Sequence, residues 1–244
     1  MEKLDEYRRQ LQGKRPKEIL RWALDEFGPD KITLASSFSI EDQVLTHIMA
    51  GIDRDSRVFT LDTGRLFQET YNVMQSTVEK YGIRYEVCFP DAGDVADMVA
   101  EKGPNLFYDS LENRKKCCDV RKMASLRKVL GTTDAWVCGL RQEQSVTRTD
   151  VEAIEWDSVF GLYKLNPLYN WTEDDVWDFI RDHGIPYNAL YKAGFRSIGC
   201  APCTRAIGAD DDVRAGRWWW ESPEHKECGL HCASVKQDFS KTTT

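Results

Sequence analysis

The sequence lacks the features that would place the protein in a membrane, outside the cell or on nucleic acid. Its apolar stretches are too short for a transmembrane helix, which needs about 20 apolar residues. Residues 1–10 are charged and contain no apolar core of a secretory signal, so we expect a cytoplasmic protein without membrane association. A formal net charge of −7 provides no basic excess to neutralise phosphates, which argues against nonspecific nucleic-acid binding. A small anionic ligand in a local basic pocket is compatible with that charge.

The sequence also lacks internal repeats, low-complexity tracts and any linker rich in proline, glycine or serine. With 244 residues and a hydrophobic fraction of 41%, it predicts a single domain with a real core. We expect N-terminal helices over residues 1–30, an α/β core over 31–195 and a loop-rich C-terminal segment over 196–244.

Short β-branched or aromatic runs alternate with helical patterns along the α/β core. The runs that predict strands are residues 31–35, 58–61, 85–89 and 135–139. Helices are predicted up to Gly28, over 67–81 with Gly82 as the stop, and from the cap Thr172 to Gly184. Such alternation indicates a mostly parallel sheet with helices on both faces.

Polar turns follow the first two predicted strands. They are Ser36, Ser37, Phe38 and Ser39 after the first strand, and Leu61, Asp62, Thr63 and Gly64 after the second. Backbone N–H groups and hydroxyls at a helix N-terminus form an anion site, and α/β sheets bind ligands at the carboxyl ends of their strands. Helix capping alone explains a serine-rich turn equally well, but two such turns on adjacent strand ends predict one shared pocket.

A third polar segment, residues 139–148, leaves the fourth predicted strand at the same edge of the sheet. The planar guanidinium of arginine suits the oxygens of phosphate or sulfate, so this segment adds anion ligands to the predicted pocket. A solvated loop with incidental charge is the alternative. The side chains in question are Arg141, Gln144, Ser145 and Arg148.

Four of the eight cysteines form two close pairs, Cys117 with Cys118 and Cys200 with Cys203. Two thiolate pairs suit a metal ion or an iron–sulfur cluster. Most structural zinc sites use knuckles in which a few residues separate the cysteines, and adjacent cysteines cannot supply these. A chance grouping of buried thiols is the alternative. The basic residues around the first pair, which would offset the charge of a thiolate-bound cluster, are Lys115, Lys116, Arg121 and Lys122.

The other cysteines have different surroundings. Cys88 and Cys138 lie in apolar strand-like runs, and we expect both to be buried core residues. Cys228 lies in the string E-C-G-L-H at residues 227–231. Nearby cationic or potentially cationic side chains, including His231, would stabilise a thiolate there, which favours a nucleophile. An ordinary surface loop is the alternative.

Taken together and in this order, these motifs resemble the sulfonucleotide reductases, from about Ile32 to His231. The two cysteine pairs resemble the branch that reduces adenosine 5′-phosphosulfate and carries a 4Fe–4S cluster. Reductases of 3′-phosphoadenosine 5′-phosphosulfate share the other motifs but lack these cysteines. The resemblance implies a Rossmann-like parallel sheet of the adenine nucleotide α-hydrolase type. It makes 31–195 the nucleotide-binding core and 196–244 the segment that carries the catalytic residue, Cys228.

The resemblance also implies a role for each group of site residues. The first turn would face the phosphosulfate, the second the adenosine, and Arg141 with Arg148 the anionic end. The paired cysteines would be the cluster ligands. The further residues assigned to the substrate are Lys122, between the cluster and the substrate, Arg214 and Arg217 at the sulfate, and Gln144, Ser145 and His231.

Two features near the C-terminus lie outside these assignments. The three adjacent tryptophans at 218–220 are expected to pack in the core rather than to stack on a base. Cys232 follows His231 directly, where the family pattern has no thiol. It is inert, or a resolving cysteine for Cys228, or a site that makes the protein easier to oxidise.

The reaction that the resemblance implies is thioredoxin-dependent reduction of adenosine 5′-phosphosulfate in sulfate assimilation. The Cys228 thiolate attacks the sulfur and expels AMP, and thioredoxin or glutaredoxin then releases sulfite from the S-sulfonate. We also expect a homo-oligomer. One alternative is the 3′-phosphorylated substrate, or dual specificity. Another is an ATP-pyrophosphatase-type enzyme, which would use a glycine-rich turn that residues 36–39 do not contain. A third is a zinc-binding module without enzymatic activity, which would be colourless where an iron–sulfur protein is brown.

Overall fold

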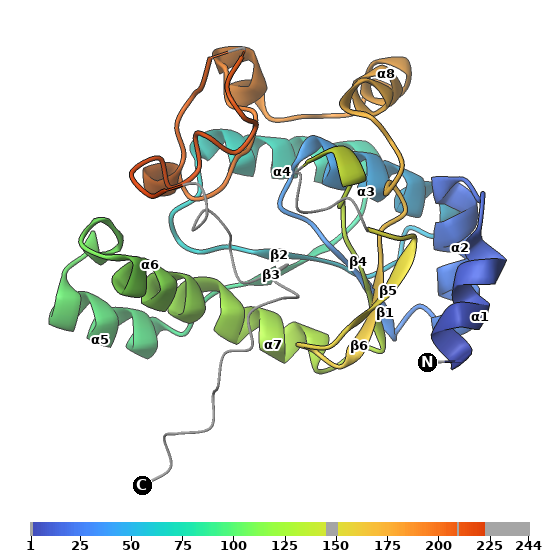
Figure 1. Ribbon diagram of the computed structural model, residues 1–244, viewed down its shortest axis with the longest axis horizontal. Helices are drawn as coiled ribbons and strands as arrows, with labels where there is room; N and C mark the ends of the chain where they lie inside the picture. Colours follow the sequence, from blue (N-terminus) through green and yellow to red (C-terminus); the bar gives the residue numbers. More distant parts are fainter. Residues whose placement is uncertain (1, 145–150, 209, 223–244) are drawn as a thin grey trace, which may run out of the picture.

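A six-stranded sheet lies at the centre of the computed structural model, which describes residues 2–144, 151–208 and 210–222 (Figure 1). The strand order is β3-β2-β1-β4-β6-β5. Every neighbouring pair is parallel except β5 with β6. The strands are β1 (Ile32–Ala35), β2 (Val58–Leu61), β3 (Tyr85–Cys88), β4 (Ala135–Val137), β5 (Ile154–Asp157) and β6 (Leu162–Leu165).

The mostly parallel sheet is confirmed, and β1 to β4 lie within the four predicted runs. The hairpin of β5 and β6 was not predicted. Strand β6 lies beside β4, with Ala135 opposite Tyr163, and β5 becomes an antiparallel edge strand with Trp156 opposite Tyr163.

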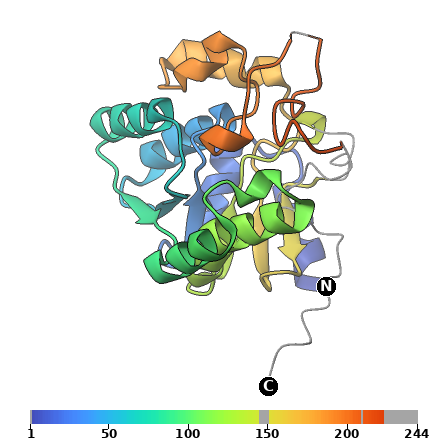
Figure 2. The same ribbon diagram turned by 90° about the vertical axis from the view of Figure 1, so that its left-hand side faces the viewer.

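Helices cover both faces of this sheet (Figures 1 and 2). One apolar core joins β1, β4 and β6 to α1 (Glu2–Leu11), α2 (Pro16–Phe27), α3 (Ile40–Ile52) and α8 (Glu173–His183). A second core, on the other face, contains α7 (Ala124–Leu130). Successive side chains of β4 alternate between the two cores, because Ala135 and Val137 belong to the first and Trp136 to the second.

A third apolar cluster lies away from the sheet and contains Met98, Phe107, Cys117, Cys203 and Trp218. It joins the C-terminal region to α5 (Ala92–Lys102) and α6 (Leu111–Cys118), while α4 (Gln68–Tyr81) precedes β3. A π-helical turn (Asp119–Met123) connects α6 to α7. Beyond residue 196, the described regular structure is one short 3-10 helix (Ala201–Cys203) and a bridge between Thr204 and Arg217, which agrees with the loop-rich character predicted there.

The predicted helix ends are confirmed by their caps. Thr172 and Asp175 form a capping box at the start of α8, and Gly184 ends that helix with a left-handed φ of 55°. Gly82 ends α4 in the same way, with a φ of 66°.

The two cysteines of the strand-like runs differ in burial. Cys138 is buried, as predicted, but the prediction was wrong for Cys88, which is partly exposed. Cys88 belongs to β3, an edge strand that has a neighbour on one side only. Among the described helices, none combines the length and the apolar character needed to cross a bilayer.

Candidate active site

A cavity of about 480 Å³ opens at the carboxyl ends of β1, β2 and β4. Residues from all three polar segments line it, and so do residues 196–199 and part of 213–218. The parallel strands therefore bring segments that are far apart in the sequence to one edge of the sheet.

The first turn is held at the start of α3 by its own hydroxyls and by Asp42. The Ser39 hydroxyl caps α3 by accepting a hydrogen bond from the Asp42 N–H at 3.3 Å. The N–H and the hydroxyl of Ser37 both donate to the Asp42 carboxylate at 2.7 Å. Burial raises the pKa of Asp42 to about 6, although the Ser37 hydrogen bonds oppose this shift. All four turn residues line the cavity.

Phe38 has a left-handed backbone, with a φ of 62°, which residues other than glycine rarely adopt. Its ring is buried and packs against Tyr85, with the ring centroids 5.1 Å apart. One residue of the turn thus has a conformation that glycine favours, but every residue of the turn carries a side chain, so the missing glycine still distinguishes it from glycine-rich phosphate turns.

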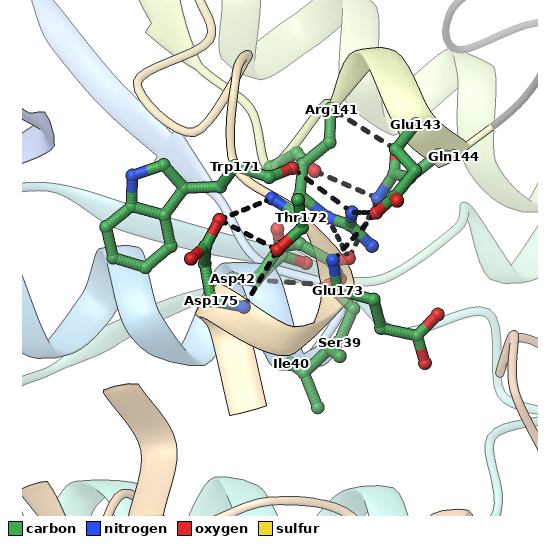
Figure 3. A network of polar contacts seen from close by, with 12 residues as sticks. Ser39, Ile40, Asp42, Arg141, Glu143, Gln144, Trp171, Thr172, Glu173 and Asp175 are labelled. Carbon is green, nitrogen blue, oxygen red and sulfur yellow. Dashed lines mark hydrogen bonds and ion pairs between the residues drawn. The ribbon is translucent and has the colours of Figure 1, made fainter. Parts of the chain in front are cut away.

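Arg141 lines the cavity but is buried and bound to carboxylates. Its Nε donates to Glu41 at 2.9 Å and an Nη donates to Glu143 at 3.1 Å (Figure 3). Gln144 donates to the same Glu41 oxygen at 3.0 Å. Glu143 also accepts the backbone N–H of Glu173, the first residue of α8, at 2.8 Å. The network thus joins the starts of α3 and α8 to the segment after β4, and the charge of Arg141 is shared with two carboxylates.

Gly139 allows the segment after β4 to approach α3 this closely. A Cβ atom at this position would lie 2.7 Å from both Asp42 Oδ1 and Glu41 Cβ. Real side chains do not make contacts that short, so the approach requires a residue without a side chain.

The second turn divides between the cavity and the cysteine region. Leu61 lines the cavity, whereas Thr63 is directed to the cysteines, with its Oγ1 at 3.2 Å from Cys200 Sγ. Asp62 accepts hydrogen bonds from the Gly64 N–H at 2.8 Å and from the Tyr71 hydroxyl at 3.0 Å. The turn therefore connects the end of β2 to the cysteine pairs.

Further cations reach the cavity from the C-terminal region. Arg214 and Arg217 line it, as does Lys122 from the π-helical turn. Arg196 lines it too and pairs with Glu173 at 2.9 Å. A Cβ at Gly199 would clash with the guanidinium of Arg217. Arg196 and Glu41 were missed by the sequence analysis, and the one available signal for Arg196 was its place shortly before Cys200.

The two cysteine pairs line a second, small cavity of about 20 Å³. Cys117 and Cys118 end α6, and Cys200 and Cys203 enclose the 3-10 helix in the C-terminal region. Lys122 and Arg217 line both cavities, so the two sites share cations. The basic residues that line the small cavity are Arg65, Arg114, Arg121, Lys122 and Arg217.

The expectation for the basic residues beside the first pair is half correct. Arg121 and Lys122 line the cysteine cavity, but Lys115 and Lys116 are exposed. Lys116 pairs instead with Glu101 at 2.7 Å. Lys115 and Lys116 precede Cys117 on α6 and lie on the side of the helix that meets solvent.

The thiols differ in how easily they ionise. Burial raises the pKa of Cys203 to about 12 and also raises the pKa of Cys117. Burial acts in the same direction on Cys200, but Lys122, the Thr63 hydroxyl and Arg217 together bring the pKa of that thiol below its ordinary value. A bound metal supplies the positive charge that buried thiols need to ionise.

Arg121 lines the small cavity and has one buried donor without a partner among the described residues. One of its Nη atoms donates to the Thr63 carbonyl at 2.7 Å, while its Nε is buried without a hydrogen-bond partner among the described residues. Buried N–H groups are nearly always bonded, and a cluster sulfur would be an acceptor. Within the described ranges, no three His, Cys, Asp or Glu side chains are grouped so as to hold a single metal ion. Four thiols, several cations and an unused donor fit a thiolate-bound cluster.

Several predicted site residues lie outside the described part of the chain. These are Ser145, Arg148, Cys228, His231 and Cys232.

The expectation that the adjacent tryptophans pack in the core holds for Trp218, which is 1% exposed in the third apolar cluster, but not for Trp219, which is 42% exposed.

The mostly parallel sheet with a cation-lined cavity at its strand ends is the arrangement in which α/β proteins commonly bind ligands such as nucleotides. Residues 31–206 match the model of the phosphoadenosine phosphosulfate reductase domain, and the chain belongs to this family. It is 52% identical to the adenosine 5′-phosphosulfate reductase of Allochromatium vinosum over 83% of this chain and 79% of that one. It is 46% identical to the adenosine 5′-phosphosulfate reductase of Burkholderia cepacia, over 84% of this chain and 82% of that one. The crystal structure of phosphoadenylyl-sulfate reductase from Candida auris shares the fold, with a TM-score of 0.72 and 24% identity, over 85% of this chain and 97% of that one.

Proposed function

We propose that the protein reduces adenosine 5′-phosphosulfate to sulfite and AMP in assimilatory sulfate reduction. The observation that carries this proposal is the pair of adjoining cavities that share Lys122 and Arg217. The larger cavity has the serine turn, a helix N-terminus and arginines, which suit a phosphosulfate. The names of the relatives from Allochromatium vinosum and Burkholderia cepacia support the choice of substrate.

The chemistry assigned to the chain is the transfer of a sulfonate group to a thiolate. The Cys228 thiolate forms a bond to the sulfur of the substrate, and the bond from that sulfur to the phosphate oxygen breaks, so AMP leaves with the electron pair. A protein dithiol such as thioredoxin or glutaredoxin then attacks the Cys228 sulfur and expels sulfite. Its second thiol resolves the mixed disulfide, so the dithiol supplies the two electrons.

The residues of the large cavity would bind and screen the charges of this reaction. Lys122, Arg214 and Arg217 line this cavity and would screen the charge of a thiolate that approaches a sulfate there. The first turn, which Asp42 holds through the N–H and the hydroxyl of Ser37, would form the wall of the cavity that faces the phosphosulfate. Arg141, held by Glu41, would act mainly by fixing the wall of the cavity.

The four cysteines Cys117, Cys118, Cys200 and Cys203 would hold a 4Fe–4S cluster. When bound, it supplies electrostatic and structural support to the neighbouring cavity. The cations that line the small cavity would balance the charge of its thiolates.

The test is a purification without oxygen, followed by three measurements. We expect a brown protein that contains iron, and incubation with adenosine 5′-phosphosulfate without reductant should add one sulfonate mass to the Cys228 peptide. Thioredoxin should then release sulfite. Cys228→Ser should keep iron and AMP binding but lose turnover. A colourless protein that binds zinc, or a sulfonate found on Cys232, would contradict the assignment.

A further inference from the structure

The guanidinium of Arg114 on α6 is buried and is held by a carboxylate from the C-terminal region. Its Nε donates to Glu221 Oε1 at 2.9 Å and its Nη2 donates to Oε2 at 2.8 Å, so the pair is bidentate. The two side chains are 2% and 7% exposed. The guanidinium also lies 4.6 Å from the centre of the Trp218 ring. Its position is therefore fixed by two neighbours as well as by its own helix.

These two neighbours are fixed in turn by the backbone of the second cysteine pair. The Glu221 N–H donates to the Trp218 carbonyl at 2.8 Å, and the Trp218 N–H donates to the Cys203 carbonyl at 3.1 Å. Trp218 is buried and lines the small cavity together with Cys203 and Arg114. The groups that hold the guanidinium thus belong to, or are bonded to, the wall of the cysteine cavity.

Arg114 also lies beside the first cysteine pair. Cys118 follows it by four positions on α6, and residues at this spacing lie on one face of a helix. Both residues line the small cavity. Burial works against the charged guanidinium, but hydrogen bonds and charges from Glu221 and then from Cys118 raise the pKa of Arg114 above its ordinary value. Arg114 therefore interacts with both the Glu221 carboxylate and the Cys118 sulfur.

The buried carboxylate gives Arg114 a different character from the cations that the two cavities share. Lys122 and Arg217 line both cavities, whereas the described residues that line the large cavity do not include Arg114. Because Glu221 balances its charge, Arg114 adds little net positive charge to the small cavity. A guanidinium has five N–H donors in one rigid plane, and Glu221 accepts two of them. The carboxylate thus sets the plane in which the other donors are aimed.

We propose that Arg114 is a positioning residue for the cluster, because it donates a hydrogen bond to the Cys118 sulfur in an orientation that Glu221 sets. The inference rests on the proposed function in one respect, the cluster at the four cysteines. A charged donor stabilises the negative charge of a thiolate and holds its sulfur in place. Loss of a partner of a metal ligand typically lowers metal affinity by about 10–100-fold. Removal of Arg114 should therefore weaken iron retention and leave AMP binding in the large cavity unchanged.

The experiment uses iron-loaded protein purified without oxygen and measures two of its properties. They are the rate of iron release to excess bathophenanthroline and the Fe–S(Cys) stretching bands in the resonance Raman spectrum. The decisive variant is Arg114→Met with Glu221→Met, which removes the donor without leaving a buried charge unpaired. It should release iron about 10–100-fold faster than wild type, with shifted bands and unchanged AMP affinity.

The matched control is Lys116→Met, which removes another cation of α6. Lys116 pairs with Glu101 in solvent, where the side chains are 43% and 55% exposed. This variant should change neither the release rate nor the bands.

Arg114→Lys separates charge from orientation. Lysine keeps a positive charge for Glu221 but has no planar fork, so iron release should be as fast as in the double variant. Wild-type release and unshifted bands in Arg114→Lys would show that charge alone suffices, which overturns the positioning role. This variant also decides if the double variant fails to fold.

A wild-type rate of iron release in the double variant would overturn the proposal. Fast release with unshifted bands would also overturn it, because the pair would then act only by packing α6 against the C-terminal region. A double variant that binds AMP like wild type but cannot be loaded with iron supports it. A wild-type protein that holds no iron overturns the proposed cluster itself, whereas an iron-containing wild type beside an unaffected double variant overturns this inference alone.

Discussion

Adding one methyl group at Gly139 should damage both stability and nucleotide binding. The Cβ of Gly139→Ala would lie 2.7 Å from Asp42 Oδ1 and from Glu41 Cβ, and the second of these atoms belongs to the base of a side chain on α3. It cannot rotate away, so the segment after β4 must move from the start of α3 by several tenths of an ångström. Overpacking of this kind costs about 1–3 kcal/mol. In a chain of this length, that loss lowers the thermal midpoint by about 2–12 °C.

The shift should also reach the ligand, because the displaced atoms hold the first turn and Arg141. We expect AMP affinity to fall by about tenfold, as expected for the loss of roughly one charge-assisted hydrogen bond. Thermal unfolding and calorimetric titration with AMP, both without oxygen, measure the two effects. The matched control is Gly51→Ala, since a Cβ at Gly51 in α3 meets nothing within 4 Å and should stabilise the helix by up to about 1 kcal/mol. Unchanged stability and AMP affinity in Gly139→Ala would refute the close-approach argument.

Three further outcomes are expected. Cys203→Ser should lose iron and most activity together, since an open cluster is easily oxidised, and full iron content with normal turnover would contradict the four-ligand assignment. Adenosine 5′-phosphosulfate should be preferred in kcat/KM over its 3′-phosphorylated form by roughly ten- to a hundredfold, because uncompensated desolvation costs on the order of 1–3 kcal/mol. High salt should reduce this preference, and equal values at low salt would indicate dual specificity. Burial raises the pKa of Asp42 from 3.8 to about 6, so the folded state favours the protonated carboxyl. This contribution to the free energy of unfolding, on the order of 3 kcal/mol, is fully present below about pH 4 and is lost as the pH rises through about 6. Asp42→Asn should therefore remove the decrease of the thermal midpoint between pH 4 and 6, and an unaltered pH dependence of the midpoint would argue against this pKa shift.

Local chemistry made β1 to β4 and the helix caps predictable. The runs are short, β-branched and bounded by polar turns, and glycine at 82 and 184 ends its helix for a local steric reason. The hairpin of β5 and β6 could not be found in this way. Ile154–Asp157 alternates with charged residues, and β6 owes its place to pairing with β4, which no local pattern records. The wrong prediction for Cys88 has a similar origin, because an apolar run does not show that its strand lies at an edge.

The same distinction applies to the candidate site. Motif order was enough to predict that parts of the three polar segments meet at one cavity, with Leu61 alone from the second turn, and that the four cysteines meet at another. The sequence did not reveal that Arg141 is bound by Glu41, a residue 100 positions away, or that Lys115 and Lys116 face solvent. Nor did it reveal the left-handed backbone of Phe38 or the burial of its ring against Tyr85 of β3. These facts follow from tertiary packing.

The cations shared by the two cavities limit how this architecture can change during evolution. Lys122 and Arg217 each face the thiols and the anion site, and Arg65, Arg114 and Arg121 line the cysteine cavity with them. A descendant that lost its cysteines would keep the buried guanidinium of Arg121 beside a cavity without thiols, which is costly in a protein interior, whereas the buried guanidinium of Arg114 would still be paired with Glu221. Loss of the cysteines should therefore be accompanied by replacement of Arg121, while Lys122 and Arg217 also line the large cavity. In relatives without the cysteine pairs, the position equivalent to Arg121 should thus have lost its charge more often than those equivalent to Lys122 and Arg217.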